Sequence, residues 1–226
     1  MAKKSGIELY LKRIFAVMFA AVGLTALTTY ATLRWGLPLI ITESGSVSPL
    51  FYIVLFAAFG LSLFAQARAF KMSAAGGAGC LAIYSAAMGF CIAPLVAFAL
   101  AVNPVSVLQA FVIAALMFGC MALFGYKTTK DLSFMGVFLF IGMIGLIITG
   151  IISMFWPFGS TANMIVSIIG VLVFALFTAY DMQFLKNAYN SVPRESEGQL
   201  AVLGALHLYI SFIAMFQYVL SLLNRR

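Results

Sequence analysis

The stretch "ANMIVSIIGVLVFALFTAYDM", residues 162–182, decides the fold class. Its only charged side chain is Asp181, close to the end of an otherwise apolar run. A helix of about 20 mostly apolar residues is long enough to cross a lipid bilayer. The stretch therefore predicts a membrane-spanning helix, and it raises the question of what a lone carboxylate does near the end of one.

The rest of the chain has the same apolar character. Of its 226 residues, 64% are hydrophobic and 8% are charged, and the mean hydropathy is +1.12. A soluble domain is roughly a quarter charged, so this composition predicts an integral membrane protein and excludes a soluble domain. The length suits one compact unit, and we expect a single transmembrane domain over residues 1–226.

Seven apolar runs have the length of a membrane span, which predicts an all-α polytopic membrane protein with seven transmembrane helices. The runs cover about residues 14–33, 50–67, 75–100, 106–125, 133–155, 162–182 and 200–223. Basic residues precede the first run, as in a signal peptide. Because that run is of spanning length and lacks a convincing cleavage site, we expect it to be retained as the first helix.

The distribution of basic residues predicts the orientation. Thirteen Lys and Arg stand against six Asp and Glu, for a formal charge of +7. The basic residues lie in short clusters between apolar runs, which indicates topology rather than nucleic-acid binding. A cytosolic N-terminus leaves only Arg34, Arg225 and Arg226 outside. The last two would also be cytosolic if the final segment were a re-entrant hairpin, and the sequence leaves that open.

Ionisable residues at membrane depth are costly, so they are candidates for function. Asp181 has two interpretations. It is either a solvated carboxylate at the interface, balanced by Lys186, or an inward-facing and partly dehydrated one, since burial disfavours the charged form. Arg68 ends the second run on the same side and is a candidate partner of Asp181.

A stripe of small and polar residues follows one face of the last run. Its members are Gly204, His207, Ser211, Ala214, Tyr218 and Ser221, spaced three or four apart. We expect this face to pack against protein or a wet cavity. His207, the only histidine, is either a satisfied interhelical hydrogen-bonding group or a titrating group near Asp181.

Motifs of enzyme chemistry are missing from the sequence. It contains no H-E-x-x-H, P-loop or G-x-S-x-G pattern. An intramembrane aspartyl protease needs two carboxylates that share a proton, and the last run holds no Asp or Glu. We therefore expect no enzymatic activity.

Four segments together resemble the Bax inhibitor-1 (transmembrane Bax inhibitor motif) family, in a bacterial type of member. They are "YSAAMGFCIAPLV" (84–96), "YKTTKDLSFMGVFLFIGMIGLII" (126–148), "LFTAYDMQFL" (176–185) and "ALHLYISFIAMFQYVLSLL" (205–223). The resemblance implies seven helices, with the last one central in the bundle. It also implies a pH-modulated calcium leak, gated by paired aspartates on the sixth and seventh helices.

Asp181 matches the first aspartate of that pair, and Ser211 stands where the second is expected. Two carboxylates can titrate as a coupled pair, whereas a carboxylate beside a hydroxyl cannot. Calcium also prefers six to eight oxygen ligands. The resemblance thus implies a weakened or altered leak, with Asp181, Ser211, His207 and Arg68 as the pH-sensing and ion-path residues and Asp181 as the candidate metal ligand.

The alternative is a regulator that transports nothing. Some bacterial members with serine at this position resemble modulators of the FtsH-type membrane protease or of membrane stress responses. We expect no cofactor other than transiently bound calcium, and no nucleic-acid partner. The lipid bilayer, calcium and a membrane protease are the expected partners. The expected location is the bacterial cytoplasmic (inner) membrane, with a cytosolic N-terminus.

Overall fold

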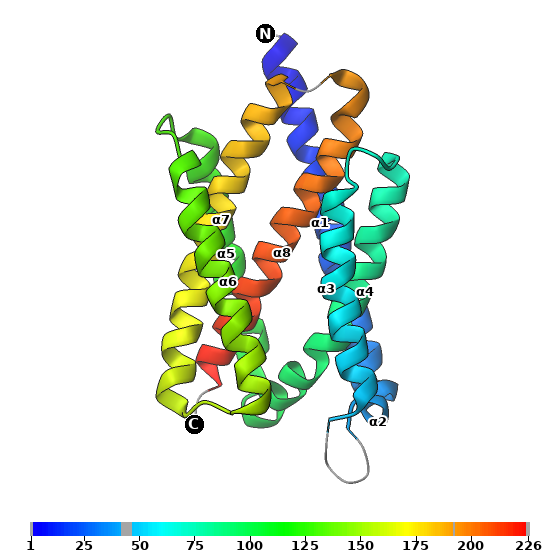
Figure 1. Ribbon diagram of the computed structural model, residues 1–226, viewed down its shortest axis with the longest axis vertical. Helices are drawn as coiled ribbons and strands as arrows, with labels where there is room; N and C mark the ends of the chain where they lie inside the picture. Colours follow the sequence, from blue (N-terminus) through cyan, green and yellow to red (C-terminus); the bar gives the residue numbers. More distant parts are fainter. Residues whose placement is uncertain (1, 42–46, 192, 225–226) are drawn as a thin grey trace. The chain divides into compact units, whose positions relative to one another are not determined.

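The computed structural model describes residues 2–41, 47–191 and 193–224, without the side chains of residues 2–5, 190 and 194. Two of the basic residues used for the orientation, Arg225 and Arg226, lie outside the described residues. The described part of the chain is helical almost throughout and contains no β-strand (Figure 1). One isolated bridge joins Ile41 to Val47. The predicted all-α fold class is confirmed.

The helices follow one another with short connections. In chain order they are α1 (Ala2–Ala31), the π-helix η1 (Thr32–Gly36), α2 (Leu37–Ile40), α3 (Pro49–Ala67), α4 (Ala74–Val102), α5 (Val105–Lys127), α6 (Ser133–Phe155), α7 (Ser160–Ser191), the 3-10 turn η2 (Arg194–Ser196) and α8 (Glu197–Leu223). Seven of them, counting α1 to α2 as one, are long and apolar enough to cross a membrane. This number was predicted.

Two helices extend well beyond their predicted apolar runs. α1 begins at Ala2 rather than near residue 14, and α7 continues to Ser191 rather than ending near residue 182. Hydropathy locates only the part of a helix inside the bilayer, whereas backbone hydrogen bonds continue through the polar turns on either side. α8 is one unbroken helix of 27 residues, so residues 197–223 do not form a re-entrant hairpin.

Side-chain acceptors fix several helix starts. Ser48 precedes Pro49 and accepts a hydrogen bond from the backbone N–H of Leu50 at 3.3 Å. At the next starts, Ser73 accepts from Gly76 and Asn103 accepts from Val105. The first backbone N–H groups of a helix have no partner within the helix, so these residues satisfy donors that would otherwise be left unpaired.

Contacts divide the chain into two compact units. The first comprises the described residues within 1–98 and 188–209, and the second those within 99–187 and 210–226. α4, α7 and α8 each contribute residues to both units. The prediction of a single transmembrane domain over residues 1–226 stays a prediction.

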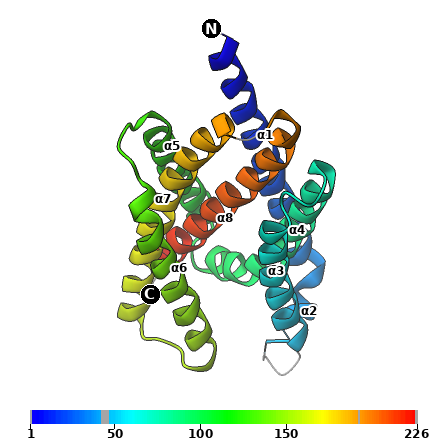
Figure 2. The same ribbon diagram turned by 45° about the horizontal axis from the view of Figure 1, so that its top comes forward.

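In the first unit, α1 packs directly against α4, while α3 and α4 lie side by side (Figures 1 and 2). A Cβ atom added at Gly89 of α4 would overlap the side chain of Thr28 in α1. The helices are also joined by hydrogen bonds from Thr25 to the carbonyl of Ser85 and from Thr29 to the carbonyl of Gly89, each 3.0 Å long. Small residues permit this close approach of helix backbones in lipid.

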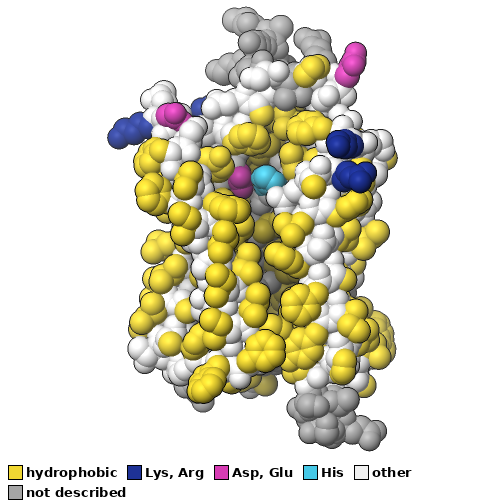
Figure 3. Space-filling model, in the orientation of Figure 1, with side chains coloured by type: hydrophobic (Ala, Val, Ile, Leu, Met, Phe, Trp, Pro, Cys, Tyr) yellow, Lys and Arg dark blue, Asp and Glu magenta, His cyan; other side chains and the backbone are white. Residues whose placement is uncertain are grey.

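In the second unit, α7 lies against α5 and α6. Added Cβ atoms at Gly125 of α5 and Gly136 of α6 would meet Ala179 and Tyr180 of α7. α6 has the smallest buried share of the seven candidate spans, at 11% of its most apolar stretch. Hydrophobic side chains cover most of its visible face (Figure 3), which is the composition of a helix that faces lipid.

α8 is the most covered of the seven candidate spans. Within its most apolar stretch, 61% of the residues are buried, against 11–39% in the other six. Its buried residues include Leu208, Tyr209, Met215 and Leu220, whereas the face that carries His207, Ala214 and Tyr218 is half-buried. This agrees with the expectation that the last helix is surrounded by others.

The contact between α5 and α7 generates a stability prediction. We expect Gly125→Ala to lower the midpoint of thermal unfolding in detergent by several degrees, because overpacking costs about 1–3 kcal/mol and each kcal/mol moves the midpoint by roughly 2–4 °C at this chain length. Gly119→Ala is the matched control, since a Cβ atom there meets nothing within 4 Å. Equal midpoints for the two variants would contradict the close contact.

Candidate functional site

Asp181 lies inside the protein. Its exposed fraction is 6%, and it is the only Asp, Glu, Lys, Arg or His among the buried residues that the structure describes. Ser211, also in the second unit, is 3% exposed. Of the two interpretations of Asp181 that the sequence leaves open, the structure supports the inward-facing carboxylate.

The turn of α7 that carries Asp181 is packed on several sides. Ala179 and Met182 are 1% and 3% exposed, and Ala179 sits against Gly125 of α5. Thr178 is buried with its hydroxyl bonded to the carbonyl of Phe174. Because the neighbouring residues of α7 are packed in this way, the rotation of the helix, and with it the side of α7 from which Asp181 projects, is fixed.

Lys186 holds the end of α5. Its Nζ donates to the backbone carbonyl oxygens of Tyr126 at 2.8 Å and Thr128 at 3.3 Å, and it lies 5.9 Å from the centre of the Tyr126 ring. The last carbonyls of a helix have no partner within the helix and carry partial negative charge, so a cation there is stabilising. Lys186, expected only to balance Asp181, thus has a structural role of its own.

Gln183 fixes the turn between α5 and α6. Its side-chain oxygen accepts from the N–H of Leu132, and its side-chain nitrogen donates to the carbonyl of Lys130, both at 2.8 Å. Gln183 is buried, so these bonds satisfy an amide that would be costly to bury unpaired. Sequence reasoning missed this residue, although a glutamine two positions after Asp181 in an apolar helix was a visible signal.

The same turn exposes charged side chains. Lys127, Lys130 and Asp131 are all exposed. Hydrogen bonds from the Ser133 hydroxyl and then from its backbone N–H lower the pKa of Asp131 below its usual value. The N–H bond is 2.9 Å long and caps the start of α6. Asp131 is therefore an ordinary charged surface carboxylate, in contrast to Asp181.

The other two predicted site residues belong to the first unit. Arg68 ends α3, is exposed, and holds its guanidinium 5.7 Å from the centre of the Phe64 ring. His207 is half-buried on α8. Asp181 and Ser211 are in the second unit, and the pairing of Asp181 with Arg68 or His207 stays a prediction.

The polar stripe of α8 is not the most buried part of that helix. Gly204 and Ser211 are buried, but His207, Ala214, Tyr218 and Ser221 are only half-buried. Tyr209, outside the stripe, is 0% exposed. Its hydroxyl is 2.7 Å from the hydroxyl of Thr25 on α1, and its ring lies edge-on to Tyr84 of α4.

Tyr209 therefore links three helices of the first unit. The signal for it was the group of threonines in the first span, because a hydroxyl at membrane depth needs a partner. Thr25 also donates to the carbonyls of Ala21 and Ser85. The cluster is neutral and its hydroxyls bond one another and the backbone, so its chemistry is that of a structural connection.

A high-affinity metal site is not evident. Among the described residues, no group of three or more His, Cys, Asp or Glu lies in positions that could hold a metal ion. Several carboxylates give calcium its affinity, and Asp181 is one carboxylate. Its role as a calcium ligand stays a prediction.

Comparison with known proteins identifies relatives over almost the full chain. The family model described as "Inhibitor of apoptosis-promoting Bax1" matches residues 7–226. An uncharacterised protein of Deinococcus radiodurans is 33% identical over 222 residues, covering 97% of this chain and 92% of that protein. The inner membrane protein YbhL of Escherichia coli is 29% identical over 226 residues, covering 99% and 94%.

The role of Gln183 can be tested by exchange of backbone hydrogens. We expect Gln183→Met to speed exchange at the Leu132 amide by about tenfold or more, since a lost bond to a buried group costs about 1–3 kcal/mol. Gln109→Met, at an exposed position of α5 in the same unit, is the control and should change nothing. Unchanged protection at Leu132 would show that the turn holds without Gln183.

Proposed function

This chain belongs to the Bax inhibitor-1 family of integral membrane proteins, and on that premise we propose that it forms a pH-modulated leak for calcium or another cation and catalyses no reaction. The observation that carries the proposal is the burial of Asp181. An ionisable group within a membrane span is costly and marks ion or proton pathways. The name of the Escherichia coli relative supports the inner membrane as the location.

The proposed modulation follows from the charge on one side chain. Ionised Asp181 attracts a cation into the path, and protonation removes that attraction and makes burial of the side chain cheaper. Asp181 is followed along α7 by Gln183 and Lys186, which bind the α5–α6 turn. Movement of α7 on protonation would therefore pull on that turn, which makes α7 the proposed gate.

Ser211 sets the proposed strength of the leak. A hydroxyl can ligate a cation weakly but carries no charge, so the path holds one carboxylate where a pair would bind calcium more tightly. We therefore propose a leak with low affinity and shallow pH dependence, weakened or altered relative to a path with two aspartates. His207 and Arg68 are kept as proposed pH-sensing and ion-path residues, and the N-terminus is proposed to lie in the cytosol.

Cation flux into dye-loaded proteoliposomes between about pH 6 and 8 tests the proposal. We expect calcium flux above that of empty liposomes, and we expect Asp181→Asn to abolish its pH dependence because the amide does not titrate. Asp131→Asn is the matched control: it makes the same change at an exposed carboxylate and should leave the pH profile intact.

Flux that is absent with folded, inserted protein would overturn the leak. Flux with a pH profile unchanged by Asp181→Asn would keep a leak but reject Asp181 as the sensor. Equal effects of the two Asp→Asn variants would indicate a general charge effect rather than a site.

The substitution Ser211→Asp tests the reasoning about the missing second carboxylate. We expect it to raise the apparent calcium affinity, and to steepen the pH dependence because two coupled carboxylates titrate together. Ser167→Asp is a suitable control, because Ser167 is buried in the same unit but bonds to Asn163 and Ser221. A calcium response to Ser211→Asp no different from that of the control would show that the surrounding path has diverged.

One observation favours regulation of a membrane protease as a second candidate function. The α5–α6 turn is held in one conformation by Gln183 and Lys186 while exposing Lys127, Lys130 and Asp131. A charged loop that already has one conformation loses less conformational entropy on binding a partner than a flexible loop does. Cross-linking from Lys130 in membranes to an FtsH-type protease, lost with Lys127→Gln/Asp131→Asn, which leaves Lys130 in place, would support this function.

A further inference from the structure

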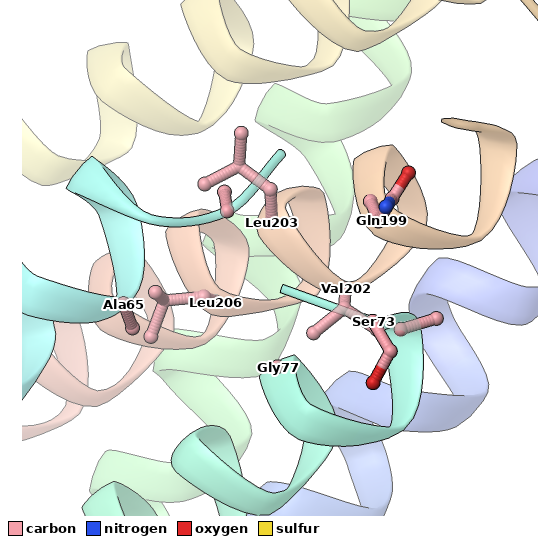
Figure 4. A pocket seen from close by; sticks show the side chains of 9 residues that line it. Ala65, Ser73, Gly77, Gln199, Val202, Leu203 and Leu206 are labelled. Carbon is pink, nitrogen blue, oxygen red and sulfur yellow. The ribbon is translucent and has the colours of Figure 1, made fainter. Parts of the chain in front are cut away.

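The small pocket of the first unit offers little room for a ligand. It lies between the end of α3, the start of α4 and the first part of α8 (Figure 4), and it has space for about one water molecule. Its polar side chains already bond to the backbone: the Ser73 hydroxyl accepts from the N–H of Gly76, and Gln199 donates to the carbonyl of Met72. A more informative feature lies in the second unit, where α7 and α8 are in contact.

Three contacts in the second unit join α7 to α8. The rings of Phe174 and Tyr218 are stacked, with centroids 6.1 Å apart and planes inclined by 25°. A Cβ atom added at Gly170 would overlap the Tyr218 ring, which therefore lies against bare backbone. The Ser167 hydroxyl donates to that of Ser221 at 3.4 Å. As residue numbers rise along α7, those of their partners fall along α8, so the two helices run antiparallel here.

The two helix faces that meet in this way carry small or polar side chains except at one level. The face of α7 is buried throughout, and its members are Ser167, Gly170, Phe174, Thr178 and Asp181. The face of α8 is the second-unit part of its polar stripe, namely Ser211, Ala214, Tyr218 and Ser221. Phe174 and Tyr218 are the only aromatic side chains in the two rows, and they stack on each other. The interface is therefore filled by bulky rings at a single level.

The ring pair lies to one side of the candidate site. Asp181 comes seven positions after Phe174 along α7. Ser211 comes seven positions before Tyr218 along α8, and seven positions of a helix span about 10 Å. Because the helices run antiparallel, Asp181 and Ser211 are displaced from the rings in the same direction, toward the α5–α6 turn. The opposite direction leads to the start of α7 at Ser160.

We propose that the stacked rings of Phe174 and Tyr218 form a barrier that separates the Asp181 site from the side of the membrane on which α7 begins. Apolar constrictions in membrane proteins stop ions because water is excluded from them. Tyr218 is half-buried whereas Phe174 is buried, so Tyr218 has the greater freedom to move. The barrier opens when the Tyr218 ring rotates away from Gly170, because the small side chains of the two faces then leave the interface unfilled at this level.

This barrier deepens the proposed leak and rests on it, since a barrier matters only where there is a path. It also gives the site a direction. While the rings are stacked, Asp181 and Ser211 exchange protons and cations only with the side of the α5–α6 turn. Access of a small cation to position 211 can be measured without any flux, so failure of the barrier and failure of the leak are distinguishable.

The reaction of Ag⁺ with a thiol introduced by Ser211→Cys tests the barrier. The protein is reconstituted with its own three cysteines replaced by alanine, and Ag⁺ is added to the side from which the exposed start of α7, labelled by Ser160→Cys, reacts. We expect the Ser211→Cys thiol to react slowly while both rings are present. Tyr218→Ala should speed its reaction by about tenfold or more, because the apolar constriction is lost.

Tyr180→Ala is the matched control. It removes the same ring from the contact of α7 with Gly136 of α6 and should leave the reaction slow. Tyr218→Phe keeps the ring and should also leave it slow. Phe174→Ala removes the other half of the barrier and should speed the reaction as Tyr218→Ala does. Thermal midpoints in detergent show whether each variant is folded, and Phe174→Ala keeps the test valid if Tyr218→Ala does not fold.

Three outcomes would overturn the barrier. A fast reaction of Ser211→Cys with both rings present would mean that the site is already open to the side where α7 begins. A slow reaction with both Tyr218→Ala and Phe174→Ala would place the obstruction elsewhere. Equal acceleration by Tyr180→Ala would indicate a general loosening of helix packing. The liposome flux assay decides the leak, whereas the thiol reaction decides the barrier, and either can fail while the other result stands.

Discussion

The need to satisfy every polar group without water governs this structure. Within lipid, an unpaired N–H, carbonyl or hydroxyl costs several kcal/mol, and helices satisfy the backbone internally. Side chains must then find partners within the protein. The hydroxyls of Thr28, Thr32 and Thr178 bond to carbonyls one turn earlier in the chain, whereas that of Thr29 reaches a carbonyl of α4.

Within the described residues, one buried polar side chain has no hydrogen-bond partner. The Tyr10 hydroxyl is the only buried side-chain nitrogen or oxygen atom there without a hydrogen-bond partner. Its ring packs against that of Tyr189, with centroids 4.9 Å apart. The aromatic contact, rather than the hydroxyl, accounts for the position of this tyrosine near the start of α1.

Because a membrane span holds few polar side chains, the residues that stabilise the fold and those of the candidate site lie close together on one helix. α7 bears Asp181, and within five residues it also bears Gln183 and Lys186, which hold the turn after α5. A change of charge at Asp181 therefore acts on a helix whose end is tied to a neighbouring turn. Interfaces of this kind shift between discrete arrangements because packed groups do not deform continuously.

Much was predictable from sequence because membrane insertion is a local property. A run of about 20 apolar residues forms a helix wherever it crosses the bilayer, so the seven spans, the all-α class and the family resemblance could be derived from residues and their order. The membrane location of Asp181, the stripe on α8 and the replacement of a second aspartate by Ser211 were equally visible.

Only the tertiary structure decided which side chains these helices bring together. Asp181 could have been solvated or buried, and it is buried because α7 packs closely on Gly125 and Gly136 of two other helices. Tyr209 and Gln183 matter because of partners 184 and 51 residues away in the chain. Hydropathy measures how favourably each segment enters lipid. These contacts depend instead on the rotation and spacing of one helix against another, and the lipid does not specify either.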